Sequence, residues 1–296
     1  MLFSFTIPTY NYANKLPLAL ESVLTQPGDD FEIIIVNDGS TDNTTEVMQT
    51  YIERYPDIIK YYSQKNQGHA AARNFAASKA QGEYLYTLDA DDKLLPNALD
   101  VMRNAIKQNP DADLIITQHY SVSESNKRQL KQLPHLSDKK ENNFIAYLRK
   151  HFSIPHGAHV VKHHVFDKIK YPLNILGRED IVFFSQVLAN FKAITANQPT
   201  LEVYKHHTSF RNQKNKHFGN LEIVDTLFNP NLITATCMQY KDEFASRIYL
   251  SFFRDNYRVK NYRAARKWYW AAIRKKPARL LQWNYFQKFI RSLIHL

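Results

Sequence analysis

The chain has 296 residues, 44% of them hydrophobic and 23% charged, which is the composition of a globular protein and excludes an intrinsically disordered one. Its formal net charge is +11, and its single cysteine, Cys237, excludes an intrachain disulfide and favours a reducing compartment. No segment approaches the roughly 18 apolar residues of a membrane span, and the apolar start at residues 1–8 lacks the basic lead of a signal peptide. We therefore expect a cytoplasmic protein that does not cross a membrane.

Strands and helices are predicted to alternate over the first part of the chain. The β-type runs lie at residues 2–8, 31–37, 58–62, 84–89 and 113–117. Apolar residues at helical spacing predict helices at 15–25, 41–55, 69–80 and 96–109 between them. This alternation predicts an α/β fold with a mostly parallel sheet covered by helices on both faces. Ligands of such sheets bind beyond the carboxyl ends of the strands, so we expect the site there.

The rest of the chain has weaker periodicity. A polar stretch at 121–143, rich in Ser, Lys, Asn and Gln, predicts a loop or an insertion beside the sheet. Further elements are expected as helices at 144–151 and 180–189 and as strands at 158–161 and 193–204. From residue 221 the pattern is helical, and Pro277 divides the last two helices. We expect two domains, residues 1–220 and 221–296.

The positive charge belongs to the end of the chain. Residues 247–296 contain 13 basic residues and one acid, Asp255, so 26 basic and 27 acidic residues precede them. The same segment holds all 3 tryptophans, Trp268, Trp270 and Trp283. Two interpretations stay open: helices with a cationic face on anionic lipid, or a helical pair that packs its aromatic residues onto the rest of the protein. No recognised nucleic-acid motif is present, so we expect no nucleic-acid partner.

The glycines limit how a nucleotide could be held. There are 7 of them, and no two are spaced as G-x-G. Dinucleotide fingerprints and P-loops need closely spaced glycines so that the backbone can approach a pyrophosphate. Both kinds of phosphate site are excluded. A nucleotidyltransferase is also disfavoured, because residues 8–15 lack the Gly-rich loop that it would need after the first strand.

Polar side chains follow three of the predicted strands. The first strand ends in Pro8-Thr9-Tyr10-Asn11, the second in Asn37-Asp38-Gly39-Ser40 and the fourth in Asp89-Ala90-Asp91-Asp92. A D-x-D triplet alone could be a solvated turn that caps the helix near Pro96. After an apolar strand, however, carboxylates can hold a hard divalent cation, which in turn neutralises a pyrophosphate.

In their order along the chain these motifs resemble the inverting glycosyltransferases of family 2, which have the GT-A fold. The resemblance covers about the first 210 residues and includes the segments 66–74, 82–92 and 177–180. It implies an α/β nucleotide-diphospho-sugar transferase fold with a C-terminal helical extension. Processive synthases of the family carry a Q-x-x-R-W motif and membrane spans, and this sequence has neither. We therefore expect an enzyme that adds single sugars.

The resemblance implies a set of residues that bind the nucleotide sugar. Thr9 and Asp38 would hold the base, with Asp38 accepting the imide N–H of uracil, since an ionised carboxylate can only accept. Arg73 would reach the base or a phosphate, and Asp89 the ribose or a metal-bound water. The full set is Pro8, Thr9, Tyr10, Asn11, Asp38, Asn66, Gly68, Arg73, Asp89 and Ala90. Without the resemblance, Asp38 could serve only the turn at Gly39.

The resemblance also implies a metal and a general base. Asp91 and His207 would bind Mn²⁺, or Mg²⁺ in its place. Asp180 would deprotonate the acceptor hydroxyl as it attacks the anomeric carbon, and Glu179 would position the acceptor, although the two roles could be reversed. An acidic pair in a first helical turn is also favoured by the helix dipole alone.

Together these expectations describe a metal-dependent inverting glycosyltransferase of hexosyl or N-acetylhexosaminyl type. It would transfer one sugar from a UDP-sugar to a hydroxyl of a glycan or lipid-linked acceptor in cell-surface polysaccharide or lipo-oligosaccharide synthesis. It would act as a peripheral protein at the inner face of the plasma membrane, held there through the C-terminal helices. The alternative is a non-catalytic membrane-associated or scaffold protein with a relic nucleotide-sugar site.

Overall fold

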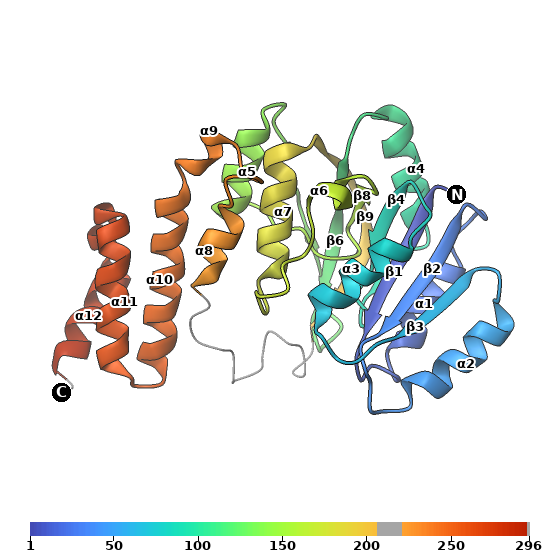
Figure 1. Cartoon of the computed structure of the whole chain (residues 1–296), viewed down its shortest axis with the longest axis horizontal. Coiled ribbons are helices and arrows are strands. Elements are labelled where there is room, and N and C mark those ends of the chain that lie inside the picture. Colours follow the sequence, from blue (N-terminus) through green and yellow to red (C-terminus); the bar gives the residue numbers. More distant parts are fainter. Residues whose placement is uncertain (206–220, 295–296) are drawn as a thin grey trace. The chain divides into compact units, whose positions relative to one another are not determined.

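The computed structural model describes residues 1–205 and 221–294 (Figure 1). The chain divides into two units, Met1–Asn212 and Gln213–Leu296. The described part of the first unit holds a β-sheet with covering helices, and the described part of the second unit is helical.

The sheet of the first unit has nine strands in its described part, in the order β3-β2-β1-β4-β8-β6-β9-β5, with β7 paired to β6 outside this path. Neighbours among β1 to β4 are parallel, and so are β6 and β9, whereas β8 pairs antiparallel to both β4 and β6. The strands are β1 Phe3–Thr9, β2 Phe31–Asn37, β3 Ile59–Ser63, β4 Tyr84–Thr87, β5 Lys93–Leu94, β6 Leu114–Val122, β7 Arg128–Lys131, β8 His159–Lys162 and β9 Ala193–Tyr204.

The helices of this unit lie between the strands in sequence. They are α1 Leu16–Leu24, α2 Thr44–Arg54, α3 His69–Lys79, α4 Ala98–Gln108, α5 Lys140–Leu148, α6 Val165–Lys168 and α7 Glu179–Asn190. The strands and helices predicted over the first 117 residues all occur, with ends shifted by up to a few residues. The strand predicted at 113–117 is longer than expected and continues to Val122.

One face of the parallel strands forms the main core with α1 and α4. Every residue of β1 and β2 is buried, as is usual for parallel strands with both faces covered. Because side chains alternate along a strand, Phe3, Phe5 and Ile7 point into this core together. The Phe5 ring stacks on Tyr86 of β4 at 4.8 Å. Burial of each such ring stabilises the fold by about 1.5–3 kcal/mol.

The opposite face is covered by α3, which packs against β1 and β2. Alanines on its buried side allow the helix to approach the sheet closely. A charged residue, Glu32, is buried on this face and accepts hydrogen bonds from Ser4 and Lys60 at 2.6 Å each. The chain also passes closely behind β1 at Gly82, where a Cβ would lie 2.6 Å from backbone atoms of Phe3 and Ser4. Only glycine fits there.

The polar stretch at 121–143, predicted as a loop or an insertion beside the sheet, is an insertion with a strand of its own. It contains β7, which forms an antiparallel hairpin with the extended end of β6. The polar residues suit an exposed edge: Arg128 pairs with Glu202 of β9 at 2.9 Å and covers the Tyr120 ring at 4.2 Å. Apolar alternation gives no signal for a strand held in this way, because neither of its faces is deeply buried.

The second unit packs three longer helices around aromatic side chains. Its elements are α8 Glu222–Leu227, α9 Ala235–Met238, α10 Lys241–Arg258, α11 Tyr262–Lys275, the 3-10 helix η2 Pro277–Leu281 and α12 Trp283–Ile294. Figure 1 shows α10, α11 and α12 side by side. Tyr269 of α11 stacks on Phe289 of α12 at 4.3 Å, next to the buried Phe253 of α10. No helix within the described residues is both long and apolar enough to cross a membrane.

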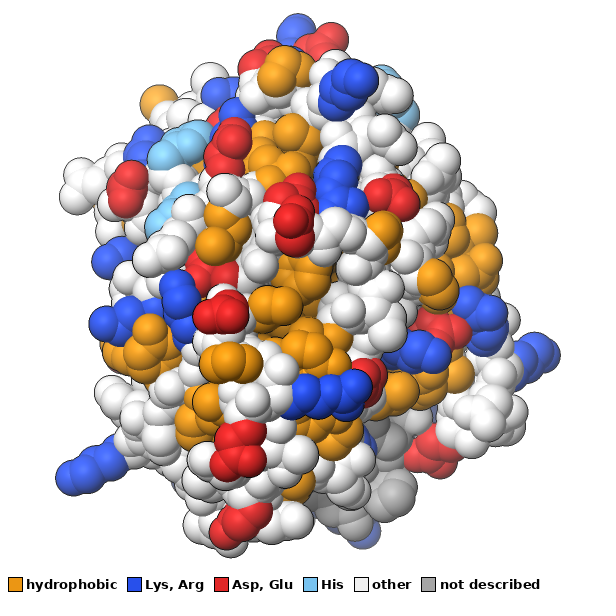
Figure 2. Space-filling view, turned by 90° about the vertical axis from the view of Figure 1, so that its right-hand side faces the viewer, with side chains coloured by type: hydrophobic (Ala, Val, Ile, Leu, Met, Phe, Trp, Pro, Cys, Tyr) orange, Lys and Arg blue, Asp and Glu red, His pale blue; other side chains and the backbone are white. Residues whose placement is uncertain are grey.

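Charge is mixed on one side of the first unit. Figure 2 shows acidic and basic side chains interspersed with apolar ones over the side that carries α2 and β3 in Figure 1. This agrees with the near balance of 26 basic and 27 acidic residues before residue 247, derived from the totals of 39 and 28. The basic excess is therefore a property of the second unit.

Candidate functional site

The carboxyl ends of β1, β2 and β4 meet at one edge of the sheet. The three strands are parallel neighbours, with Thr9 beside Asn37 and Thr6 beside Thr87 in the register. The residues that follow them, among them Asp38 and Asp89, therefore emerge at the same edge, as the sequence predicts. Pro8 and Thr9 are buried at the end of β1, and the Thr9 hydroxyl has no hydrogen-bond partner among the described residues.

Asn11 connects the first two of these strand ends. Its backbone has a φ of 55°, and its side-chain oxygen accepts a hydrogen bond from the Thr41 backbone N–H at 2.7 Å. In return, the Asn11 N–H donates to the Ser40 hydroxyl at 2.9 Å. Asparagine tolerates this left-handed conformation better than most residues. The turn leaves Tyr10 exposed at the edge.

The Asp38 carboxylate organises the loop that leads into α3. It accepts hydrogen bonds from the Gln64 side chain at 2.8 Å and from the backbone N–H groups of Gln67 and Gly68 at 2.9 and 2.8 Å. Gly68 has a φ of 90° and precedes the first residue of α3. Asp38 is thus a structural acceptor for this loop, whereas the sequence offered a structural role for it only in the turn at Gly39. Asn66, from the same loop, is exposed.

We expect Asp38→Asn to weaken the fold as well as any nucleotide binding. An amide presents one acceptor oxygen where the carboxylate presents two, so at least one of the three donors is left without its partner. The expected loss is about 1–3 kcal/mol in the free energy of unfolding, measured by urea denaturation. Asp57→Asn, on an exposed aspartate of the same unit, is the matched control and should change stability by less than about 0.5 kcal/mol. Equal stability of the two variants would contradict the structural role.

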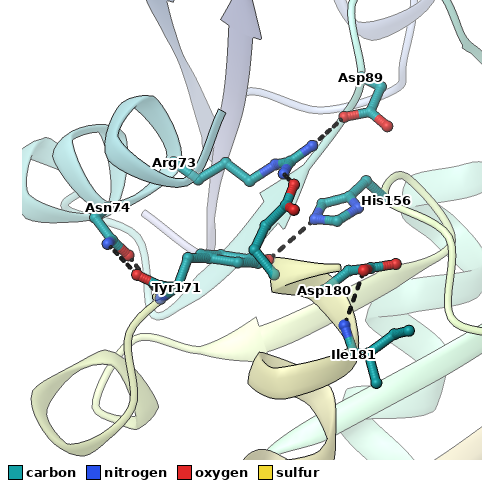
Figure 3. A network of polar contacts seen from close by, with 8 residues as sticks. Arg73, Asn74, Asp89, His156, Tyr171, Asp180 and Ile181 are labelled. Carbon is teal, nitrogen blue, oxygen red and sulfur yellow. Dashed lines mark hydrogen bonds and ion pairs between the residues drawn. The ribbon is translucent and has the colours of Figure 1, made fainter. Parts of the chain in front are cut away.

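Arg73 is the centre of a buried charge network. Its Nη2 donates to Asp89 Oδ1 at 2.9 Å, and its Nη1 donates to Glu179 Oε1 at 3.2 Å (Figure 3). The guanidinium is buried, and its planar fork joins carboxylates from two distant parts of the chain. Burial raises the pKa of Asp89, but the charge and hydrogen bond of Arg73 outweigh it and hold that pKa well below its usual range.

This arrangement differs from the role that the resemblance implies for Arg73. Both of its terminal nitrogens bind carboxylates of the chain rather than lying open to a base or phosphate. Two buried atoms of the network, Arg73 Nε and Glu179 Oε2, have no hydrogen-bond partner among the described residues. Arg73 therefore positions Asp89 and Glu179 relative to one another.

Tyr171 is a further member of this network, and no motif in the sequence predicts it. Its backbone N–H and carbonyl oxygen form reciprocal hydrogen bonds with the Asn74 side chain at 2.9 and 2.8 Å (Figure 3). Its ring stacks on Phe183 of α7 at 4.1 Å, and its hydroxyl lies 3.1 Å from His156 Nε2. These contacts fix the segment before α7 against α3. The residues are separated by up to 97 positions, so no local pattern could indicate them.

Two histidines beside this network are kept neutral. Burial, followed by the nearby Arg73 charge, lowers the pKa of His156 well below its usual value. Burial lowers the pKa of His159 to about 4. The Nδ1 atom of His159 lies 3.0 Å from the Pro155 carbonyl oxygen, which can only accept, so Nδ1 carries the proton. Both rings lie against Phe184.

We expect this burial to make stability depend on pH between about 6.5 and 4. In this window an unfolded histidine binds a proton that the folded His159 does not, so stability falls as the pH falls. A change from the ordinary pKa to about 4 corresponds to about 2 kcal/mol lost between pH 7 and pH 4.5. His159→Phe should lose correspondingly less over that range in urea denaturation. Parallel pH curves for the two proteins would contradict the prediction.

The three aspartates of the D-x-D segment, Asp89, Asp91 and Asp92, have different partners, and that of Asp89 is Arg73. Asp92 is buried and accepts from the Tyr204 backbone N–H at 3.0 Å, so it ties the segment to β9. Asp91 is half-buried and accepts a hydrogen bond from Tyr12. Burial and these carboxylates raise the pKa of that phenol. Ala90 is buried between them.

The carboxylate oxygens at this site could hold a hard cation only if a substrate phosphate supplied further oxygen ligands. Within residues 1–205 and 221–294, no group of three or more His, Cys, Asp or Glu side chains could hold a metal ion. The oxygens of Asp91 and Asp89 are hard ligands, and magnesium or manganese is commonly held by one or two carboxylates plus substrate phosphates. The other predicted ligand, His207, lies outside the described residues.

Asp180 stands in the first turn of α7, next to Glu179. Its Oδ1 accepts from the Ile181 backbone N–H at 2.8 Å (Figure 3). It is half-buried, whereas Glu179 is buried against Arg73. Gly177, with a φ of 69°, lets the chain turn just before the helix. The two acids therefore have different surroundings. Glu179 is buried in the ion pair with Arg73, whereas Asp180 is partly exposed to solvent.

Comparison with known proteins agrees with this geometry. The family model described as "Glycosyl transferase family 2" matches residues 4–169, more than half of the chain. The chain belongs to glycosyl transferase family 2. The match includes Thr9, Asp38, Arg73 and the D-x-D segment, and it ends before α7 with its two acids.

Relatives of known sequence are also described as glycosyltransferases. The chain is 30% identical over 191 residues to the uncharacterized glycosyltransferase MJ1057 of Methanocaldococcus jannaschii, which covers 64% of this chain and 65% of that protein. It is 35% identical over 125 residues to the glycosyltransferase GlyG of Streptococcus pneumoniae, covering 42% of this chain and 41% of that one. The matched part is thus less than two thirds of the length of these relatives.

The same fold occurs in a solved crystal structure. Residues 1–349 of Staphylococcus aureus TarS, crystallised in complex with UDP-GlcNAc, superpose with a TM-score of 0.71 at 19% identity, covering 99% of this chain and 89% of that one. At this identity the likeness concerns the fold. This family 2 chain has the α/β GT-A-like fold with a C-terminal helical region, as the sequence predicts.

Proposed function

We propose that the chain is an inverting glycosyltransferase that moves one sugar from a UDP-sugar to a hydroxyl of a glycan or lipid-linked acceptor. The observation that carries the proposal is the pairing of Asp89 and Glu179 with Arg73 at the carboxyl edge of the sheet, which brings together the two segments that also carry Asp91 and Asp180. In doubly wound sheets this edge is where ligands bind. Membership of family 2 supports the reaction class.

The uracil base would lie at the ends of β1 and β2. The buried hydroxyl of Thr9 has no hydrogen-bond partner in the described part of the chain and is available for a hydrogen bond to the base or ribose. Asp38 has two oxygens that already accept three internal donors, and a carboxylate can accept further bonds from an imide N–H. Uracil offers that donor and cytosine does not. The UDP-GlcNAc complex of TarS supports a uridine donor for this fold.

The diphosphate would lie beside Asp89 and Asp91. These residues would hold Mn²⁺ or Mg²⁺, which when bound neutralises the diphosphate and so stabilises it as a leaving group. Tyr12 keeps the Asp91 carboxylate oriented through its hydrogen bond. Arg73 holds Asp89 in place and ionised, since its positive charge keeps the pKa of that carboxyl low.

Asp180 would be the general base. The reaction needs a group that takes the proton of the acceptor hydroxyl as it attacks from the face opposite the departing diphosphate. Asp180 is less buried than Glu179 and is not paired with Arg73 in the network. Glu179, held by Arg73, would fix the position of the helix that carries the base.

A panel of UDP-sugars tests the function. We expect one or a few of them, with Mn²⁺, to raise the melting temperature and to be hydrolysed slowly without acceptor. CDP and GDP sugars should raise it less. Asp91→Ala should lose the metal-dependent part of the thermal shift, and Asp100→Ala, on an exposed aspartate of α4, is the matched control. Binding of UDP and Mn²⁺ without turnover of any UDP-sugar would favour a non-catalytic protein instead.

A further inference from the structure

The last two helices of the second unit carry apolar side chains that face away from their own core. In α12, Trp283, Ile290 and Ile294 are seven and four residues apart, a spacing that places them on one face of the helix. They are 63%, 41% and 76% exposed. The buried face of the same helix is formed by other residues, Phe289 and Ser292. This helix therefore has an exposed apolar face in addition to the side that is covered within its unit.

The neighbouring helix α11 presents an exposed cationic face. Arg263, Lys267, Trp270 and Arg274 are spaced by three to four residues and so share one side of the helix. All four are exposed, Trp270 by 48%. The Trp270 ring lies 5.4 Å from the Phe289 ring, so this side of α11 lies next to α12. We call the two faces together the α11–α12 surface.

The charge of this surface is not balanced by acids. After Asp255 the chain has 11 basic residues and no acidic one. The three acids of α10 already have partners: Asp242 pairs with Lys275 at 2.8 Å, Glu243 with Lys276 at 2.7 Å and Asp255 with Arg254 at 3.5 Å. Arg263, Lys267 and Arg274 form no ion pair with any residue that the structure describes.

We propose that the α11–α12 surface binds the face of an anionic lipid bilayer. Tryptophan and branched aliphatic side chains enter the boundary between head groups and acyl chains, while Arg and Lys beside them attract anionic head groups. The α12 helix has 12 residues and is about 18 Å long, too short to span a bilayer, so it lies in the interface. The proposal goes beyond the reaction and does not depend on it.

Other occupants fit this surface less well. A second copy would bring two cationic faces together across a two-fold axis, with no acid in the segment after residue 255 to compensate. A nucleic acid would meet the basic residues but not the exposed aliphatic ones, Leu281 at 87% and Ile294 at 76% among them. A bilayer accommodates both kinds of side chain at once.

Tryptophan fluorescence can report directly on this surface, because all three tryptophans lie in α11 and α12. The full chain is mixed with vesicles of phosphatidylcholine alone or with 30% phosphatidylglycerol, and bound protein is measured by co-sedimentation. We expect binding to the anionic vesicles only, weakened by 0.5 M salt. Lipids brominated on the acyl chains should quench the tryptophan emission, since Trp283 enters the interface.

Two sets of variants separate charge from apolar contact. Arg263→Gln with Lys267→Gln and Arg274→Gln should lower the affinity about 100-fold, at about fivefold for each charge. Lys107→Gln with Lys127→Gln and Lys139→Gln removes the same charge from exposed lysines of the first unit, and it should have little effect.

Trp283→Ser with Ile294→Ser should lower the affinity about tenfold or more, since buried apolar area is lost. Leu18→Ser with Val259→Ser is its control, on two residues that are 44% and 58% exposed. Because all changed residues are exposed, melting temperatures should stay within about 2 °C of the parent. Equal binding to neutral vesicles, absence of quenching, or equal effects of the two charge triplets would overturn the proposal. So would a dimer that forms without lipid and is lost in Trp283→Ser with Ile294→Ser.

Discussion

Asp180→Asn is expected to remove sugar transfer while the protein still binds its donor. An amide cannot take the proton of the acceptor hydroxyl, and loss of a general base typically lowers kcat by about 10²–10⁴-fold. The fold should be unaffected, because the Asn oxygen can still accept from the Ile181 N–H as Asp180 does at 2.8 Å. Steady-state kinetics with the best UDP-sugar and titration of UDP binding measure the two effects separately.

A matched control for this substitution is Asp167→Asn. Asp167 also lies in the first turn of a helix, α6, and is exposed away from the network. It should keep its activity within about twofold. If Asp180→Asn retains its kcat and Glu179→Gln loses it while both proteins stay folded, the roles of the two acids are reversed.

Arg73→Met is expected to destabilise the first unit strongly. It leaves the carboxylates of Asp89 and Glu179 facing each other without the guanidinium that binds both, at 2.9 and 3.2 Å. Removing one partner of a buried ion pair typically costs about 3–5 kcal/mol. Urea denaturation at pH 7 should show a loss of this size, and Arg54→Met, on an exposed arginine of α2, should lose less than about 1 kcal/mol.

The same substitution should also change how stability depends on pH. In the parent, Arg73 holds the pKa of Asp89 below its unfolded value, so this contribution is complete above about pH 4 and is lost as the pH falls further. Without Arg73 the burial that raises that pKa loses the largest charge that opposes it, so the variant should regain stability on acidification from pH 7 to 5. A loss that does not vary over this range would contradict the account of the network.

The fold could be predicted from the sequence because its signals are local. Parallel strands buried on both faces contain a continuous apolar run, such as residues 33–36, and the helices between them carry apolar residues at helical spacing. The strand ends then follow, since residues after parallel neighbours must share an edge. The sequence alone therefore assigns Asp38, Asp89 and Asp91 to that edge.

The connections within the site could not be predicted, because they join residues far apart in sequence. The Arg73–Glu179 bond spans 106 positions, and Asn74 and Tyr171 span 97. The spacing of residues along the chain cannot indicate such long-range pairs. Arg73 was therefore expected to bind the base or a phosphate, whereas it binds the carboxylates of Asp89 and Glu179. The strand β7 was missed for a related reason: it is held by its partner β6 and by the Arg128–Glu202 pair rather than by burial.

The long last strand of the first unit determines how short a working fragment can be. The family match ends at residue 169, yet β9 runs as far as Tyr204 and pairs with both β6 and β5, while the Tyr204 N–H anchors Asp92. A truncation at residue 169 would remove α7 and leave an open, unpaired edge along β6, where other chains could attach and aggregate. Expression boundaries for domain dissection should therefore be placed beyond residue 204.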